Sequence, residues 1–378
     1  MLLIIIYVSF ISLGLPDSLL GSAWPSMYEF LSAPMHYAGY ASMIIAGGTV
    51  ISSVFSEKVI RRLGTGRVTF ISVFMTAIAL IGFSFSRNFI FLCFCAIPLG
   101  CGAGSVDAAL NNYVALHYKA KHMSFLHCFW GIGASCGPLI MAFFLGKTGS
   151  WQWGYRTIAL IQMGLVAVLF FAIPLWRKGT TEIVHKKSPS FSILFKIPGL
   201  KPALFTFFCY CTIETITGLW GSSYLVTVRN IAPEHAARWI ALYYIGITGG
   251  RFISGFLTVR LNGRRMVRIG QLFIAIGVVL LCSPLYVPGF FIIGLGCAPI
   301  FPSLLHETPR NFGEEYSQSI MGLQMASAYI GTALMPPLFG KLASFTGFSI
   351  LPFVLGIVLI IKIIMVEILN RRVGNRNS

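Results

Sequence analysis

The sequence predicts an all-α integral membrane protein whose twelve transmembrane helices form two six-helix, pseudo-symmetric repeats. Three observations predict it. First, 56% of the 378 residues are hydrophobic and only 10% are charged, whereas soluble domains carry about 25% charged residues. Second, apolar runs of about 20 residues, the length that crosses a bilayer, follow one another along the chain. Third, short motifs with Gly and Pro recur in the same order in both halves of the chain.

Twelve apolar runs are long enough to cross a bilayer. They lie at about residues 2–30, 38–58, 68–86, 89–115, 123–146, 154–176, 201–226, 236–259, 267–285, 287–307, 318–340 and 347–370. The eighth run is the weakest of these predictions, because it contains Arg238 and Arg251. We therefore expect an N-terminal six-helix bundle over 1–176, a basic linker over 177–200 and a C-terminal six-helix bundle over 201–378.

Lysine and arginine are distributed unevenly among the connecting loops. Most of the 28 basic residues lie in one set of loops, including the linker. Because cytoplasmic loops carry this excess, we expect a multi-pass protein of the cytoplasmic membrane with both termini in the cytoplasm. The same loops account for the net charge of +17 without a nucleic-acid partner.

Three pairs of motifs indicate the internal repeat. They are Gly47-Gly48-x-x-Ile51-Ser52 and Gly249-Gly250-x-x-Ile253-Ser254, Ile132-Gly133-x4-Pro138 and Ile330-Gly331-x4-Pro336, and Gly146-Lys147 and Gly340-Lys341. Each match alone is weak, but three in one order at nearly one offset are not expected by chance. Two parallel six-helix repeats are typical of transporters that bind substrate near the membrane midplane between the halves.

The sequence resembles the major facilitator superfamily over essentially its whole length. The loop after the second run, residues 53–62, keeps the acid, the base and the basic pair of that family's G-x-x-x-D-R-x-G-R-R motif but neither glycine. Within the superfamily the chain is most similar to the fucose permease group of sugar–proton symporters. The similar stretches are Pro16-Asp17-Ser18-Leu19-Leu20, residues 100–111, Gly249-Gly250-Arg251-Phe252-Ile253-Ser254-Gly255, Pro302-Ser303 and Asn311-Phe312-Gly313. This resemblance implies proton-coupled uptake by alternating access, with Asp17 and Asp107 as candidate groups for substrate and protons.

Asp17 and Asp107 are the only aspartates in the chain, and both lie in apolar runs. A carboxylate at membrane depth costs about 3 kcal/mol on insertion scales, so such a residue is functional by default. Gly14 and Pro16 weaken the helix beside Asp17, and broken backbone at this depth faces protein or a water-filled space. The alternative is that each aspartate is a structural partner of another polar group.

Three further polar residues complete the central set of candidates. Asn111 lies four residues after Asp107 and therefore on the same helix face. Glu214 is in the middle of the seventh run and could bind substrate or a proton. Arg251 cannot lose its charge, so it must face a water-filled space or an acid such as Glu214 or Asp107. A permanent structural ion pair is nearly as well supported for Arg251.

Aromatic and amide side chains are possible substrate contacts, because sugars stack on aromatic rings and hydrogen-bond to amides. These candidates are Trp24, Trp220, Tyr224, Gln162 and Gln324, together with His127 as a possible proton carrier. For each aromatic residue, an interfacial or packing role is the simpler interpretation. For His127, the simpler interpretation is a packed, hydrogen-bonded histidine.

The motifs exclude several classes of function. The sequence has no Ser-His-Asp set, no HExxH and no phosphate-binding loop, so we expect neither an enzyme nor a cofactor, and no metal site. The leading hypothesis is a monomeric, proton-driven symporter of a small polar solute, such as a sugar. The alternative is a proton-coupled exporter, a drug or metabolite antiporter, because acids in the central space suit export equally well.

Overall fold

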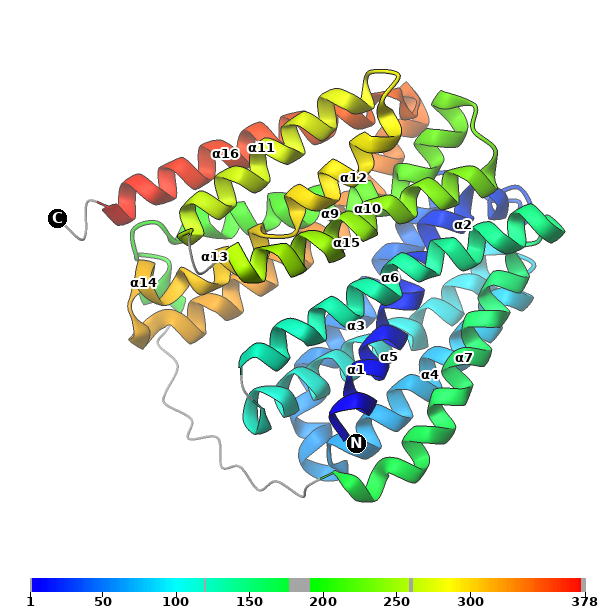
Figure 1. Cartoon of the computed structure of the whole chain (residues 1–378), viewed down its shortest axis with the longest axis horizontal. Helices are drawn as coiled ribbons and strands as arrows, with labels where there is room; N and C mark the ends of the chain where they lie inside the picture. The colour runs from blue at the N-terminus through cyan, green and yellow to red at the C-terminus, as the bar shows by residue number, and fades with distance from the viewer. Residues whose placement is uncertain (1, 119, 177–190, 258–260, 375–378) are drawn as a thin grey trace.

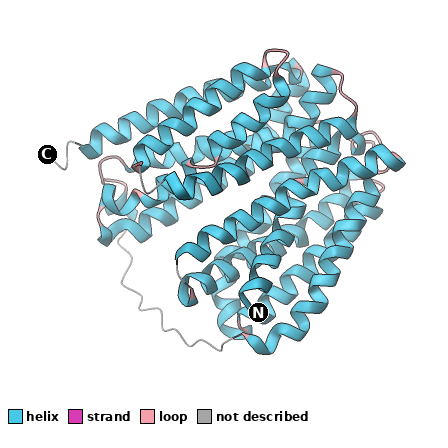
Figure 2. Cartoon of the chain, in the orientation of Figure 1, coloured by secondary structure: helices cyan, strands magenta, loops and turns pink. Residues whose placement is uncertain are grey.

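The computed structural model describes residues 2–118, 120–176, 191–257 and 261–374, and within these ranges all regular secondary structure is helical (Figures 1 and 2). Most of the predicted linker lies outside the described residues. The first group of helices is α1 (Leu2–Asp17), α2 (Leu19–Met27), α3 (Tyr37–Leu63), α4 (Thr65–Phe85), α5 (Phe89–His117), α6 (Ala120–Thr148) and α7 (Trp151–Ala172).

The second group follows a short helix, α8 (Phe191–Leu194). Its members are α9 (Leu200–Arg229), α10 (Pro233–Leu257), α11 (Gly263–Leu281), α12 (Tyr286–Cys297), α13 (Ile300–His306), α14 (Thr308–Phe312), α15 (Glu314–Thr346) and α16 (Leu351–Gly374). Short 3-10 helices extend α7 at Ile173–Leu175 and precede α16 at Phe348–Ile350.

The all-helical membrane fold is confirmed, whereas the count of twelve spans is only partly supported. Ten segments of the described chain are long and apolar enough to cross a membrane. The predicted ninth and eleventh runs form α11 and α15, which are not among the ten. The reason lies in their composition, because α11 carries three arginines near its start and α15 begins with two glutamates and is rich in Ser, Thr and Gln.

The two groups of helices pack in the same way. In the first, α1 packs on α6 and α3 on α5; in the second, α9 packs on α15 and α10 on α12. The recurring glycines occupy matching places: Gly48 faces the backbone of α5 and Gly250 faces α12, while Gly133 faces α1 and Gly331 faces α9. The sequence motifs therefore mark helix contacts that recur in both groups, because small residues let helices approach closely.

The two bundles meet chiefly where α6 packs on α10, α3 on α15, and α2 on both α9 and α10. In Figure 1 they converge near α2 and separate toward the end where α1 begins and α16 ends. We call the latter the terminal end and the former the sealed end. The sealed end closes through backbone contacts, because Gly21 lies against α9, Gly39 against Pro337 and Gly340 against the His36 carbonyl.

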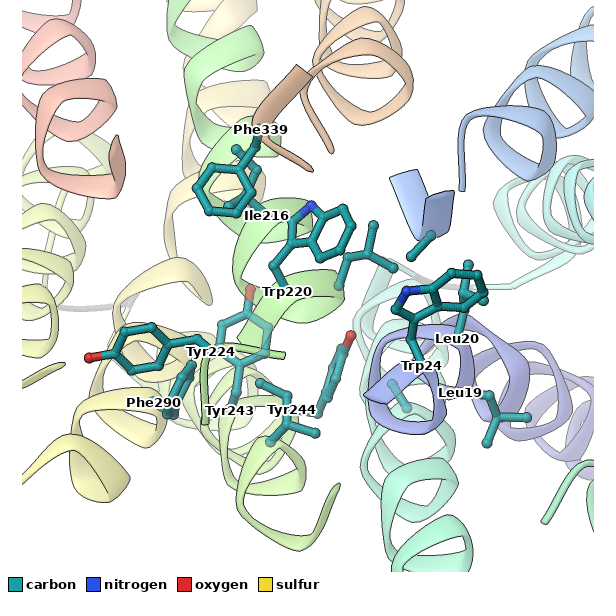
Figure 3. Close-up of a cluster of buried hydrophobic side chains, with 14 of the residues drawn as sticks. Leu19, Leu20, Trp24, Ile216, Trp220, Tyr224, Tyr243, Tyr244, Phe290 and Phe339 are labelled. Carbon is teal, nitrogen blue, oxygen red and sulfur yellow. The ribbon is translucent and has the colours of Figure 1, made fainter. Parts of the chain in front are cut away.

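Two buried tryptophans lie at the sealed end. Trp24 of α2 faces Trp220 of α9, with Tyr244 of α10 beside them (Figure 3). The Trp24 Nε1–H donates to the Met35 carbonyl at 2.6 Å, and the Trp220 Nε1–H donates to the Pro336 carbonyl at 3.0 Å. Each indole thus buries its ring while its donor is satisfied, as buried tryptophans require.

The first transmembrane segment is broken at the predicted position. Residue Ser18 separates α1 from α2, immediately after Asp17. Pro16 has no N–H to donate to the Ser12 carbonyl one turn earlier. The Gln162 Nε2–H of α7 donates to that carbonyl instead, at 2.8 Å, and Gln162 Oε1 accepts from the Thr76 hydroxyl at 2.9 Å. Gln162 therefore satisfies the backbone group that the proline leaves free.

Glycines set the close contact of α1 with α6. A side-chain carbon on Gly14 would collide with the Trp130 carbonyl, and one on Gly133 would collide with the Ile11 carbonyl. Both obstacles are backbone atoms, which cannot rotate away. The approach of α1 to α6 therefore depends on these two glycines and fixes the position of Asp17, three residues after Gly14.

We expect Gly14→Ala to lower thermal stability clearly, because overpacking a close contact costs about 1–3 kcal/mol. The matched control is Gly47→Ala, since no atom lies within 4 Å of a side-chain carbon built on Gly47. Thermal denaturation of both purified variants in detergent checks this prediction. Equal melting temperatures for the two variants would show that the close contact of α1 with α6 does not matter for stability.

Candidate functional site

Asp17 lies at the junction of α1 and α2 and is bound by a tryptophan of α6. The Trp130 Nε1–H donates to Asp17 Oδ2 at 2.7 Å. Asp17 is exposed although it lies within an apolar span, so the space beside it admits solvent. The charged carboxylate therefore has one protein donor and access to water at membrane depth.

The same indole contacts a cation from the other bundle. The Arg251 guanidinium of α10 lies over the ring of Trp130, 4.9 Å from its centre. Arg251 Nη2 also lies 3.7 Å from Glu214 Oε1 of α9, and the two side chains are only 17% and 21% exposed. Asp17, Trp130, Arg251 and Glu214 thus form one continuous chain of contacts that crosses between the bundles.

Asp107 and Asn111 form a second polar group on α5. The Asn111 Nδ2–H donates to Asp107 Oδ1 at 2.9 Å, so the predicted i,i+4 pair is formed. Asp107 lies close enough to Asp17 for their charges to repel, and it also acts electrostatically on Tyr329 of α15. The two aspartates therefore interact electrostatically, and Asp107 also interacts with a tyrosine of the opposite bundle.

The contact between α6 and α10 leads from the sealed end to this polar set. From the sealed end it runs from Gly146 beside Glu234 to Gly131 beside Thr248, and the Trp130–Arg251 contact follows one helical turn further. Toward the terminal end, His127 on α6 and Phe252 on α10 are exposed. The polar residues therefore lie where the closed part of the interface gives way to an accessible part.

Comparison with known proteins identifies the family of this chain. A family model described as the Major Facilitator Superfamily matches residues 6–282 and 203–377. The chain belongs to the major facilitator superfamily.

Two curated superfamily relatives cover most of the chain. The glucose/mannose transporter GlcP of Bacillus subtilis is 22% identical over 88% of this chain and 86% of its own length. Bypass of stop codon protein 6 of Saccharomyces cerevisiae is 21% identical over 91% of this chain and 77% of its own length. The family and the transporter relative identify the chain as a membrane transporter and not an enzyme, as expected; the finer likeness to fucose permeases stays a prediction.

Solved structures of other transporters share the fold. The nucleoside transporter NupG superposes with a TM-score of 0.78 at 14% identity, covering 97% of this chain and 98% of its own. A peptide transporter, POT, superposes with a TM-score of 0.78 at 15% identity, covering 99% of this chain and 95% of its own. These similarities extend over both bundles and concern the fold alone.

The remaining candidates lie apart from the central set, with their polar atoms bonded to protein. Trp24 and Trp220 belong to the sealed end, and Gln162 to the break in α1. The Tyr224 hydroxyl donates to the Leu281 carbonyl at 2.8 Å, and Gln324 Oε1 accepts from the Thr308 hydroxyl at 3.0 Å. In this arrangement their contacts hold helices together, and a role in substrate contact stays a prediction.

His127 lies near the central set without a direct contact to Asp17. Its ring is exposed, packs edge-on against Phe10 and acts electrostatically on Arg251. No group of three or more His, Cys, Asp or Glu side chains in the described chain could hold a metal ion.

Sequence reasoning missed three residues of this site: Trp130, Tyr244 and Tyr329. Tyr244 of α10 acts electrostatically on both Asp17 and Glu214. The sequence carries a weak signal for Trp130, because it precedes the repeated Ile132-Gly133 motif that packs α6 on α1. Nothing in the sequence sets Tyr244 and Tyr329 apart from the other tyrosines of the chain.

Proposed function

We propose that this transporter moves a small neutral polar solute, a sugar or a related compound, together with protons. The observation that carries the proposal is the exposed Asp17 carboxylate in mid-span, linked through Trp130 to a cation of the other bundle. A carboxylate that can gain a proton at membrane depth is the usual means of coupling in membrane transporters. The relationship to a glucose/mannose transporter supports a sugar as the solute.

The charges of the central set favour protons as the coupling ion. Three acids, Asp17, Asp107 and Glu214, face a single cation, Arg251. Glu214 pairs with Arg251, which leaves two aspartates without a basic partner in the central set. Proton binding by either aspartate would reduce this excess of negative charge at membrane depth. Neutralised carboxyl groups, Asn111 and Tyr329 would then hydrogen-bond a neutral solute.

The transport cycle that we propose is alternating access. The two bundles rock about the central set, so that one end closes while the other opens. The arrangement described above, closed near α2, is one state of this cycle. The positive-inside distribution of basic loops supports a cytoplasmic position for the terminal end and both chain termini, in a cytoplasmic membrane. The state is then inward-open, in a protein that works as a monomer.

A panel of solutes in proteoliposomes tests this function. Purified protein would be offered labelled hexoses, deoxyhexoses, amino sugars and cationic drugs, with and without an imposed pH gradient, acidic outside. We expect one sugar class to accumulate only when the gradient is present. A cationic drug that leaves the vesicles toward the acidic side while protons enter would assign the chain to the antiporters instead. No transport of any solute by well-inserted protein would contradict the proposal.

A further inference from the structure

We infer that Trp130 couples the ionisation of Asp17 to the contact between the two bundles. Trp130 is a positioning residue in this role: it holds Asp17 with its N–H and Arg251 with its ring face. The inference deepens the proposed function and rests on the proposed proton coupling. In this inference, Trp130 transmits the protonation state of Asp17 to the interface between the bundles, which must open and close during transport.

The two contacts of Trp130 respond differently to a proton on Asp17. A hydrogen bond to an ionised acceptor is roughly twice as strong as a neutral one, so protonation of Asp17 weakens its 2.7 Å bond to Nε1–H. The ring then loses its main directional restraint. A cation over an aromatic face is favoured only while the ring stays in place, so movement of the indole weakens the Arg251 contact across the interface.

Trp130 lies where a small movement of its ring can change the accessibility of the α6–α10 interface. Its contact with Arg251 lies next to the close contact of Gly131 with Thr248 in the α6–α10 interface. Residues beyond it, including His127 and Phe252, are exposed. Loss of the Trp130–Arg251 contact would therefore extend the accessible part of the interface toward the sealed end.

Other ionisable groups surround this chain of contacts. In the described part of the molecule, Asp17 interacts with Asp107 of α5 and Tyr244 of α10. Arg251 interacts with Glu214 of α9 and with His127 and Cys128 of α6. Asp17 therefore lies between a like charge on Asp107 and the N–H donor of Trp130. Trp130 alone among these groups contacts both Asp17 and Arg251 directly.

A native cysteine reports on this interface. Cys128 lies two residues before Trp130, is partly exposed and acts electrostatically on Arg251. Cys282, at the end of α11, is exposed and serves as an internal reference. Both thiols would be labelled with N-ethylmaleimide in detergent-solubilised full-length protein and quantified by peptide mass spectrometry. Thiol reactivity itself depends on pH, and dividing the labelling of Cys128 by that of Cys282 cancels most of this dependence.

The decisive variant is Trp130→Phe, which keeps an aromatic face for Arg251 and removes the donor to Asp17. Its matched control is Trp176→Phe, because the buried Trp176 Nε1–H has no hydrogen-bond partner among the described residues. Asp17→Asn provides an independent way to remove the charge. Each variant would be labelled in buffers about two pH units apart, a range that changes a single titrating group almost completely.

We expect the Cys128/Cys282 labelling ratio to rise about threefold or more at acidic pH in the unmodified protein and in Trp176→Phe. The reason is that the population shifts toward the conformation in which the interface is more accessible. In Trp130→Phe and Asp17→Asn the ratio should be high at both pH values. Retention of the normal pH dependence in Trp130→Phe would overturn the inference, as would a ratio that does not depend on pH in the unmodified protein.

The outcomes separate this inference from the proposed function, because the labelling uses no solute. If the labelling ratio depends on pH and on Trp130 but the protein moves no solute with protons, the link between Asp17 and the interface holds and proton symport is rejected. Proton-driven solute uptake with a pH dependence unaffected by Trp130→Phe would retain symport and reject the role of Trp130.

Discussion

Asp17→Asn is expected to abolish accumulation of the solute against its gradient while exchange across the membrane continues. A gradient of one pH unit stores about 1.4 kcal/mol per proton, enough for about tenfold accumulation of a neutral solute moved with one proton. Asparagine is close in shape to the protonated aspartate but cannot release a proton. The variant should therefore equilibrate the solute to a ratio of about one, measured as labelled solute inside and outside proteoliposomes.

The controls for this prediction come from the same chain. Glu29→Gln removes an exposed acid that accepts a hydrogen bond from Tyr28 outside the spans and should leave accumulation unchanged. Asp107→Asn tests the second aspartate, which carries its own bond from Asn111. Normal accumulation by both aspartate variants would show that neither carries the coupling proton.

Glu214→Gln is expected to reduce transport at least about tenfold and to lower thermal stability more than Arg251→Gln does. The asymmetry follows from chemistry: without Glu214 the arginine keeps its charge, whereas without Arg251 the glutamate can bind a proton. Breaking a fully buried ion pair costs about 3–5 kcal/mol; because these side chains are 17% and 21% exposed, we expect about 2 kcal/mol. Uptake assays and thermal denaturation of the purified variants measure the two effects.

A second ion pair provides the matched control. Arg268 and Glu367 form a bidentate bridge, with a distance of 2.8 Å between Arg268 Nη2 and Glu367 Oε2, but their side chains are 59% and 37% exposed. Such exposed pairs contribute about 0–1 kcal/mol, so Glu367→Gln should change neither transport nor stability appreciably. The double variant Arg251→Gln with Glu214→Gln should regain stability but not transport. Equal stability losses for Glu214→Gln and Glu367→Gln would contradict the central role of the first pair.

Much of the fold could be predicted from the sequence, because lipid imposes simple rules. Apolar length predicted the runs that became helices, and the paired glycine motifs predicted contacts that recur between equivalent helices. The break at Asp17 was predictable from Gly14 and Pro16. Two runs, α11 and α15, are too polar to qualify as spans by composition alone, because helices that lie against other helices need not be apolar all round.

The candidate site was predictable in its charged members and not in its aromatic ones. A charge in an apolar run is rare, so Asp17, Asp107, Glu214 and Arg251 stand out in the sequence. Trp130 does not, because tryptophan is common in membrane helices and only the three-dimensional packing brings it between Asp17 and Arg251. Trp24 and Trp220 show the converse: their sequence positions suggest a site, and the structure places them in the closure at the sealed end.

The most direct test of proton symport follows solute and protons in the same vesicles. Proteoliposomes with a pH-sensitive dye inside and equal pH on both sides would receive the sugar identified by the panel, while solute entry and internal pH are recorded together. We predict that the internal pH falls as the sugar enters, with a fixed ratio of protons to sugar at every sugar concentration. Sugar entry at constant internal pH, or with a rise in internal pH, would contradict the account.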